Sequence, residues 1–81
     1  MRVTIRLFAR LRDLAGAGTL SRDVPAGATV DAVWQGLARE FPAMATSRAS
    51  LAAAVNAEFA TFATPVTDGD EIAFLPPVSG G

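Results

Sequence analysis

The sequence has 81 residues, a hydrophobic content of 51% and a formal net charge of −1. A chain this short forms a single domain with a compact core, and its apolar content argues against disorder. The absence of cysteine excludes disulfides and thiolate metal sites and favours a reducing, cytoplasmic location. A nearly neutral charge and the absence of a run of about 18 apolar residues predict neither nucleic-acid nor membrane partners.

The N-terminal segment predicts two strands with a long connection. Residues 2–8 alternate with a period of two, which places Phe8 on the face opposite the aliphatic residues. Residues 9–15 are expected to form a short helical turn that stops at Gly16. Residues 19–24 are expected to form the second strand.

An amphipathic helix is predicted next. Thr29 is a suitable N-cap, Asp31 lies in the first turn, and Pro42 ends the segment. Trp34 belongs to the apolar stripe, so we interpret it as a core residue. The apolar positions at helical spacing are Val30, Val33, Trp34, Leu37, Ala38 and Phe41.

The region after the helix carries weaker patterns. Residues 43–50 are small and polar, and we expect an irregular link there. Residues 51–55 and 59–62 are expected to form short strands, with residues 56–58 as the turn between them.

The final strand completes the predicted fold. In the turn at residues 67–70, Gly69 supplies a positive φ, and residues 71–75 then form a strand. One helix with an apolar stripe needs a sheet to cover, so the class is α+β. We expect a β-grasp domain over residues 1–75, with a mixed sheet whose first and last strands are parallel central neighbours.

The C-terminus is the candidate working part. Pro76 and Pro77 lack the N–H donor of a central strand, so residues 76–81 are expected to leave the domain as a flexible, extended tail. The chain has no histidine, cysteine, lysine or tyrosine, which makes side-chain catalysis improbable. Gly80 and Gly81 carry no Cβ and can thread a narrow channel, where a partner could activate the Gly81 carboxylate.

The sequence has a family resemblance that extends over nearly the whole chain, and three segments carry it most clearly. They are residues 7–16 (LFARLRDLAG), residues 54–56 (AVN) and residues 68–81 (DGDEIAFLPPVSGG). The sequence resembles the small, sulfur-carrier subunit of molybdopterin synthase, of the ubiquitin-like superfamily that also holds thiamine sulfur carriers. The Asp-Gly-Asp-Glu turn and terminal Gly-Gly are shared by the superfamily, whereas the ending PPVSGG favours the molybdopterin branch.

The resemblance implies a sulfur cycle. An E1-like adenylyltransferase would use ATP to adenylate Gly81, and a sulfurtransferase system would convert it to a thiocarboxylate. The tail of Pro76, Pro77, Val78, Ser79, Gly80 and Gly81 would then enter the large subunit of a heterotetrameric synthase. There it would give sulfur to cyclic pyranopterin monophosphate. The carrier itself would bind no cofactor, and side-chain catalysis would belong to the large subunit.

Strand parity indicates a docking surface. Phe8 and Leu75 both face away from the predicted helix. The resemblance implies that these two residues and Phe59 form a hydrophobic contact with both partners, the adenylyltransferase and the large subunit. Arg12 could meet an acidic partner surface or simply be a solvated basic residue. The carboxylates of residues 68–71 are interpreted as a solvated turn, so no metal site is expected.

Three other functions remain open at this point. The chain could carry sulfur for thiamine or another thio-metabolite, or act as a ubiquitin-like modifier joined through Gly81 to partner lysines. It could also be an interaction module with an incidental Gly-Gly ending.

Overall fold

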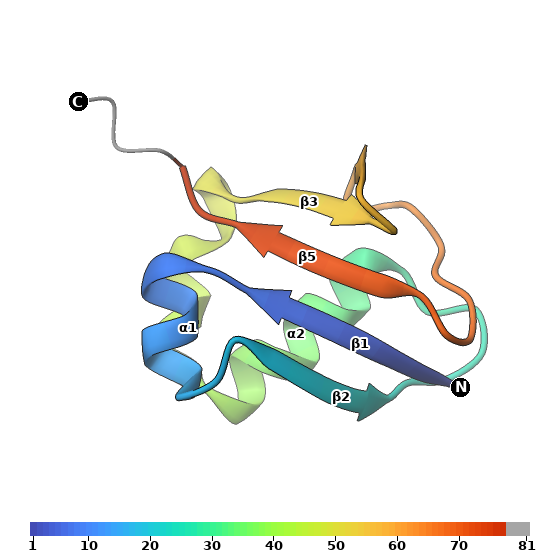
Figure 1. The fold of residues 1–81 in the computed structure, drawn as a ribbon, viewed down its shortest axis with the longest axis horizontal. Coiled ribbons are helices and arrows are strands. Elements are labelled where there is room, and N and C mark those ends of the chain that lie inside the picture. Colours follow the sequence, from blue (N-terminus) through green and yellow to red (C-terminus); the bar gives the residue numbers. More distant parts are fainter. Residues whose placement is uncertain (78–81) are drawn as a thin grey trace.

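A computed structural model of the chain describes residues 1–77, and residues 78–81 lie outside the described part. The structure is a mixed five-stranded sheet in the order β2-β1-β5-β3-β4, with helices packed beside it (Figure 1). The elements are β1 (Arg2–Leu7), α1 (Ala9–Ala15), β2 (Thr19–Asp23), α2 (Val30–Glu40), the 3-10 helix η1 (Pro42–Ser50), β3 (Ala52–Val55), β4 (Glu58–Ala60) and β5 (Glu71–Leu75). This order of strands around one main helix is the β-grasp arrangement, so the predicted fold class is confirmed. None of the helices in residues 1–77 is both long enough and apolar enough to span a bilayer.

The two central strands run parallel, as predicted. β1 pairs with β5 so that Ile5 faces Ile72 and Leu7 faces Phe74, and all four side chains are buried. Alternate residues of both strands therefore point into the core, while the residues between them lie on the other face of the sheet. A shift of one residue in this pairing would turn the apolar set toward solvent.

The helix α2 covers the core face. Its buried residues include Trp34, whose ring meets Phe74 edge-to-face with the ring centroids 5.1 Å apart. Such aromatic pairs contribute beyond the apolar area that they bury. Trp34 is thus a core residue, as the helical stripe indicated.

The N-terminus of α2 has the predicted cap. The hydroxyl of Thr29 accepts a hydrogen bond from the amide of Ala32 at 3.2 Å, and Thr29 itself has extended backbone angles. This bond satisfies one of the amides that a helix leaves unpaired in its first turn.

Thr29→Ala should lower the free energy of unfolding by about 1 kcal/mol, because that amide loses its acceptor. Denaturant unfolding followed by circular dichroism measures the change. Thr29→Ser keeps the acceptor and should stay close to the parent, and equal losses in the two variants would contradict the capping role.

Two expectations for the region after α2 were wrong. Residues 43–50 belong to the 3-10 helix η1, in which Met44 is fully buried and Pro42 stands in the first turn. A single buried anchor gives too little periodicity to be recognised in the sequence. The strand expected over residues 59–62 is β4 and ends at Ala60, because Thr61 and Thr64 form a hydrogen-bonded turn.

Candidate functional site

The face of the sheet opposite α2 carries one row of residues in register across four strands. Phe59 of β4 pairs with Ala54 of β3, Ala54 pairs with Ala73 of β5, and Ala73 pairs with Arg6 of β1. Residues paired directly across strands share a face, so this row lies on the open side of the sheet. Two alanines in the middle of the row leave a depression between larger side chains.

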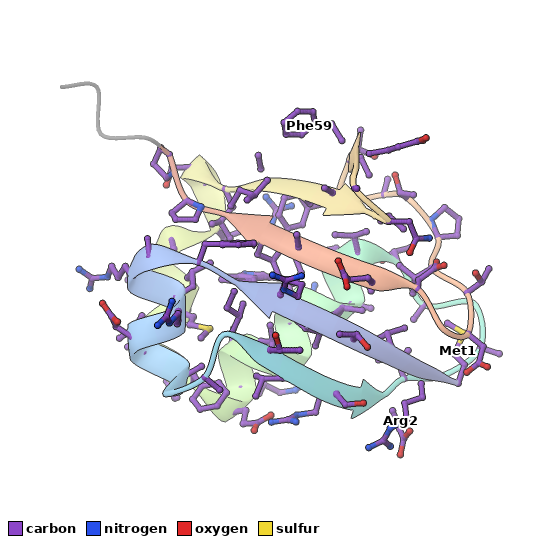
Figure 2. The ribbon with its side chains drawn as sticks, in the orientation of Figure 1. Met1, Arg2 and Phe59 are labelled. Carbon is purple, nitrogen blue, oxygen red and sulfur yellow. The ribbon has the colours of Figure 1, made fainter. Side chains whose placement is uncertain are left out.

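This depression brings together the three apolar residues that were predicted to contact a partner. We call it the sheet hollow, and it is lined by Arg6, Phe8, Ala54, Ala57, Phe59, Glu71, Ala73 and Leu75. Phe59 is 84% exposed and Phe8 37% exposed, and they are the large hydrophobic residues left exposed in residues 1–77. Figure 2 shows Phe59 at the edge of the sheet, beyond β3. Exposed aromatic residues beside an apolar depression are typical of a protein-binding surface.

Backbone geometry explains how Phe8 and Leu75 come to adjoin. Leu7 and Phe74 pair across the parallel strands, and Phe8 and Leu75 directly follow them in the sequence. Both strands run toward the same end of the sheet, where α1 also lies (Figure 1). One residue beyond the buried pair, each side chain points to the open face.

A polar pair borders the sheet hollow. The guanidinium of Arg6 lies 3.7 Å from the Glu71 carboxylate and 5.6 Å from the centre of the Phe8 ring. Both charged side chains are partly exposed, so the pair contributes little to stability. It gives the apolar surface a polar rim, as in many protein interfaces.

A second depression continues this surface toward the C-terminus. It is lined by Ser50, Ala52, Phe59, Leu75, Pro76 and Pro77, and we call it the adjoining hollow. Phe59 and Leu75 line both depressions, so one apolar surface extends from Ala57 to Pro77. Pro76 and Pro77 follow β5 outside any strand. The predicted tail residues Val78, Ser79, Gly80 and Gly81 lie outside the described residues.

Arg12 is not part of either hollow. It is exposed on α1, where its aliphatic carbons lie beside Gly18 and its carbonyl accepts the hydrogen bond that caps the helix. Within residues 1–77 no carboxylate lies at ion-pair distance from Arg12. Its role at a partner surface stays a prediction.

Sequence reasoning missed Arg6, Ala54 and Ala57 as residues of the site. The outward parity of Arg6 was visible, but the sequence contains no signal that the small residues of β3 and its turn lie opposite β5. That information is the register of β3 with β5 and β4.

The carboxylates of the turn before β5 are held by hydrogen bonds from the protein. Asp68 accepts a bond from the Arg2 amide at 2.7 Å, and Asp70 accepts bonds from the Thr67 amide at 2.8 Å and the Asn56 side chain at 2.9 Å. The hydrogen bonds to Asp70 lower its pKa below the ordinary value; the bond from the Thr67 amide has the larger effect and the bond from the Asn56 side chain the smaller. In residues 1–77 no group of acidic side chains has the arrangement of a metal site.

The lowered pKa of Asp70 predicts a loss of stability in acid. At neutral pH Asp70 is ionised in both states, and its hydrogen bonds contribute fully to the folded state. As the pH falls through about 4 the unfolded chain binds a proton first, so the free energy of unfolding decreases until Asp70 is also protonated in the folded state.

Asp70→Asn should therefore lose less stability between about pH 7 and pH 3 than the parent protein. Urea unfolding at each pH provides the comparison. Glu40, whose pKa the Arg22 guanidinium lowers, is present in both proteins, so its contribution cancels in the difference. Identical pH profiles would contradict the assignment to Asp70.

The fold and the site together define a β-grasp protein of the ubiquitin-like class, with an exposed apolar surface that reaches Pro77. The chain belongs to the ThiS family, whose family model matches residues 5–81.

Similar proteins place the chain more narrowly. It is 41% identical over 83 residues to the molybdopterin synthase sulfur carrier subunit of Escherichia coli, covering 98% of this chain and 99% of that protein. It is 35% identical over 79 residues to the corresponding subunit of Arabidopsis thaliana, covering 98% of this chain and 82% of that protein. The crystal structure of SAMP1 from Haloferax volcanii matches with a TM-score of 0.88 and 31% identity over the full length of both chains. The resemblance to molybdopterin synthase carrier subunits is thus confirmed.

Proposed function

We propose that this protein is the sulfur-carrier subunit of a molybdopterin synthase and works through the carboxylate of Gly81. The observation that carries the proposal is the full-length similarity to such a subunit at 41% identity. The apolar surface from Ala57 to Pro77 supports it, because a partner that receives the C-terminus must contact the domain near the root of the tail.

The proposed chemistry has three steps. The carboxylate of Gly81 attacks the α-phosphorus of ATP on an activating enzyme, which forms an acyl-adenylate and releases pyrophosphate. A sulfur nucleophile at the oxidation level of hydrosulfide, supplied by a sulfurtransferase system, attacks the acyl carbon and displaces AMP, leaving a thiocarboxylate. That sulfur then attacks a carbon of the acceptor and displaces an oxygen leaving group from it. Water hydrolyses the acyl–sulfur bond, so that sulfur stays on the acceptor and the carboxylate returns.

This chain would contribute positioning and no side-chain catalysis. The sheet hollow and the adjoining hollow would bind an apolar surface of the large synthase subunit, with Phe8, Phe59 and Leu75 as the contacts. Residues 76–81 would then carry Gly81 into the large subunit's active site, where cyclic pyranopterin monophosphate accepts the sulfur. The domain thereby converts a reaction between separate molecules into one between held groups.

Intact-mass measurement tests the carrier step. The protein is incubated with an E1-like activating enzyme, ATP and a sulfur donor, and one terminal oxygen should be replaced by sulfur. Omitting ATP should leave the mass unchanged. A mass that stays constant with all components present, while a known carrier gains sulfur in the same mixture, would reject the proposal.

Transfer to the acceptor separates the molybdopterin branch from its relatives. The thiocarboxylated protein, mixed with the large subunit and cyclic pyranopterin monophosphate, should yield molybdopterin. Transfer only to a thiamine precursor or another thio-metabolite would assign the protein to the alternative carrier class.

A second candidate function is protein modification. It is favoured by the similarity to SAMP1, a small archaeal modifier protein, at 31% identity. A modifier would form an amide between Gly81 and a lysine of another protein. The same activating mixture, with a lysine-containing extract added, distinguishes the two functions, because a modifier gives covalent conjugates that survive thiol reductants.

A further inference from the structure

The turn between β3 and β4 is a two-residue hairpin turn with a positive φ at both residues. Asn56 has a φ of 51° and Ala57 a φ of 70°, so both residues are left-handed. A side chain with a Cβ is disfavoured in this region, although asparagine tolerates it better than alanine. The remaining non-glycine residue with positive φ in residues 1–77 is Ala9, which directly follows Phe8. All the strained positions therefore lie within three residues of an exposed phenylalanine.

The side chain of Asn56 ties this turn to the start of β5. The backbone N–H of Asn56 donates to the carbonyl of Glu71 at 2.8 Å, and the backbone N–H of Glu71 donates to the side-chain oxygen of Asn56 at 3.0 Å. The side chain thus supplies an acceptor at the point where the backbone leaves the β3–β5 ladder. The N–H groups of both residues and the carbonyl of Glu71 are therefore paired where the strand pairing ends.

Asp70 completes the connection. Its carboxylate accepts a hydrogen bond from the Asn56 side-chain nitrogen at 2.9 Å and another from the Thr67 amide at 2.8 Å. The carbonyl of Asp70 also accepts a bond from the Thr4 amide of β1 at 2.9 Å. The β3–β4 turn is therefore anchored to the central strands of the sheet.

The hairpin needs such an anchor because its own packing is slight. β4 has three residues, lies at the edge of the sheet and pairs with β3. Phe59 is 84% exposed, so its ring has few neighbours to hold it. Ala57, inside the turn, and Phe59 nevertheless both line the sheet hollow.

We propose that Asn56 and Asp70 are positioning residues of the sheet hollow, and that the hydrogen-bonded clasp between them holds Ala57 and Phe59 in place for docking. The inference rests on the proposed function, in which this hollow binds the large synthase subunit. Neither clasp residue needs to touch the partner. When Ala57 and Phe59 are ordered before binding, the entropic cost of ordering them during binding is avoided.

An exchange of the two residues tests the clasp. Asn56→Asp alone sets two carboxylates against each other and removes the donor, whereas the double variant Asn56→Asp with Asp70→Asn restores a donor and an acceptor in reversed positions. Asn56→Gly removes the side chain but readily keeps the left-handed backbone. Hydrogen exchange of the β4 amides reports on the hairpin, and exchange of the β1 and β5 amides reports on the whole domain.

We expect Asn56→Asp and Asn56→Gly to speed β4 exchange about tenfold, the equivalent of one lost hydrogen bond, beyond any change in β1 and β5. Their Kd for the large subunit should rise by about the same factor, and the double variant should recover both values. A role in overall stability alone would change all strands together and would not give this difference.

Several results would overturn the proposal. Unchanged β4 exchange in both single variants would show that the clasp does not hold the hairpin. Faster β4 exchange with an unchanged Kd would show that docking does not need Ala57 and Phe59 to be held in place, provided that Phe59→Ala weakens binding in the same assay. If Phe59→Ala also leaves the Kd unchanged, the docking surface in the proposed function is wrong, and the positioning role fails with it.

Discussion

A protein without Gly81 is expected to fold normally and to transfer no sulfur. Deletion moves the terminal carboxylate back by one residue, or about 3.5 Å of extended chain, so it no longer reaches the reacting centre of the activating enzyme. A misplacement of even about 1 Å at a reacting centre can reduce a rate a hundredfold. Intact-mass measurement after incubation with activating enzyme, ATP and sulfur donor should show no thiocarboxylate.

Stability provides the control for this deletion. The deletion removes no side chain and leaves the buried residues found in residues 1–77 in place, Phe74 and Ile72 of the last strand among them, so the free energy of unfolding should change by less than about 0.5 kcal/mol. Gly81→Ala keeps the chain length and adds one methyl group. It should react more slowly than the parent if the terminus threads a narrow channel. Full thiocarboxylate formation by the deleted protein would refute the role of Gly81.

The second large effect is expected at Phe59. Phe59→Ala should raise the Kd for the large synthase subunit roughly thirtyfold, a loss of about 2 kcal/mol, because Phe59 lines both hollows and a few aromatic anchors carry much of the binding energy of an interface. Isothermal titration or surface plasmon resonance measures this value.

Because Phe59 is exposed, a loss of binding in this variant can be separated from a loss of stability. Its side chain is 84% exposed, so its removal should leave the free energy of unfolding within about 0.5 kcal/mol of the parent. Arg39→Ala, an exposed change on α2 and away from both hollows, serves as the matched control and should bind like the parent. Parent-like binding by Phe59→Ala would place the docking surface elsewhere.

Much of the fold was accessible from local patterns. The last strand was predicted over its observed range, residues 71–75, because the turn around Gly69 marks its start and Pro76 marks its end. The cap at Thr29 and the core position of Trp34 followed from helical spacing in the same way. The 3-10 helix η1 was missed because one buried methionine does not make a pattern.

Some residues of the candidate site could be predicted from the sequence, and others could be found only in the tertiary structure. Composition and resemblance alone pointed to Gly81 as the reacting residue, since the chain has no lysine, cysteine, histidine or tyrosine to act in its place. Strand parity showed that Phe8 and Leu75 face outward, because side chains alternate along any strand. The resemblance added Phe59 to this contact, and only the tertiary structure placed Ala54 beside the three residues and tied Asn56 to Asp70. Such neighbours depend on strand register, which long-range packing decides, and local sequence does not encode it.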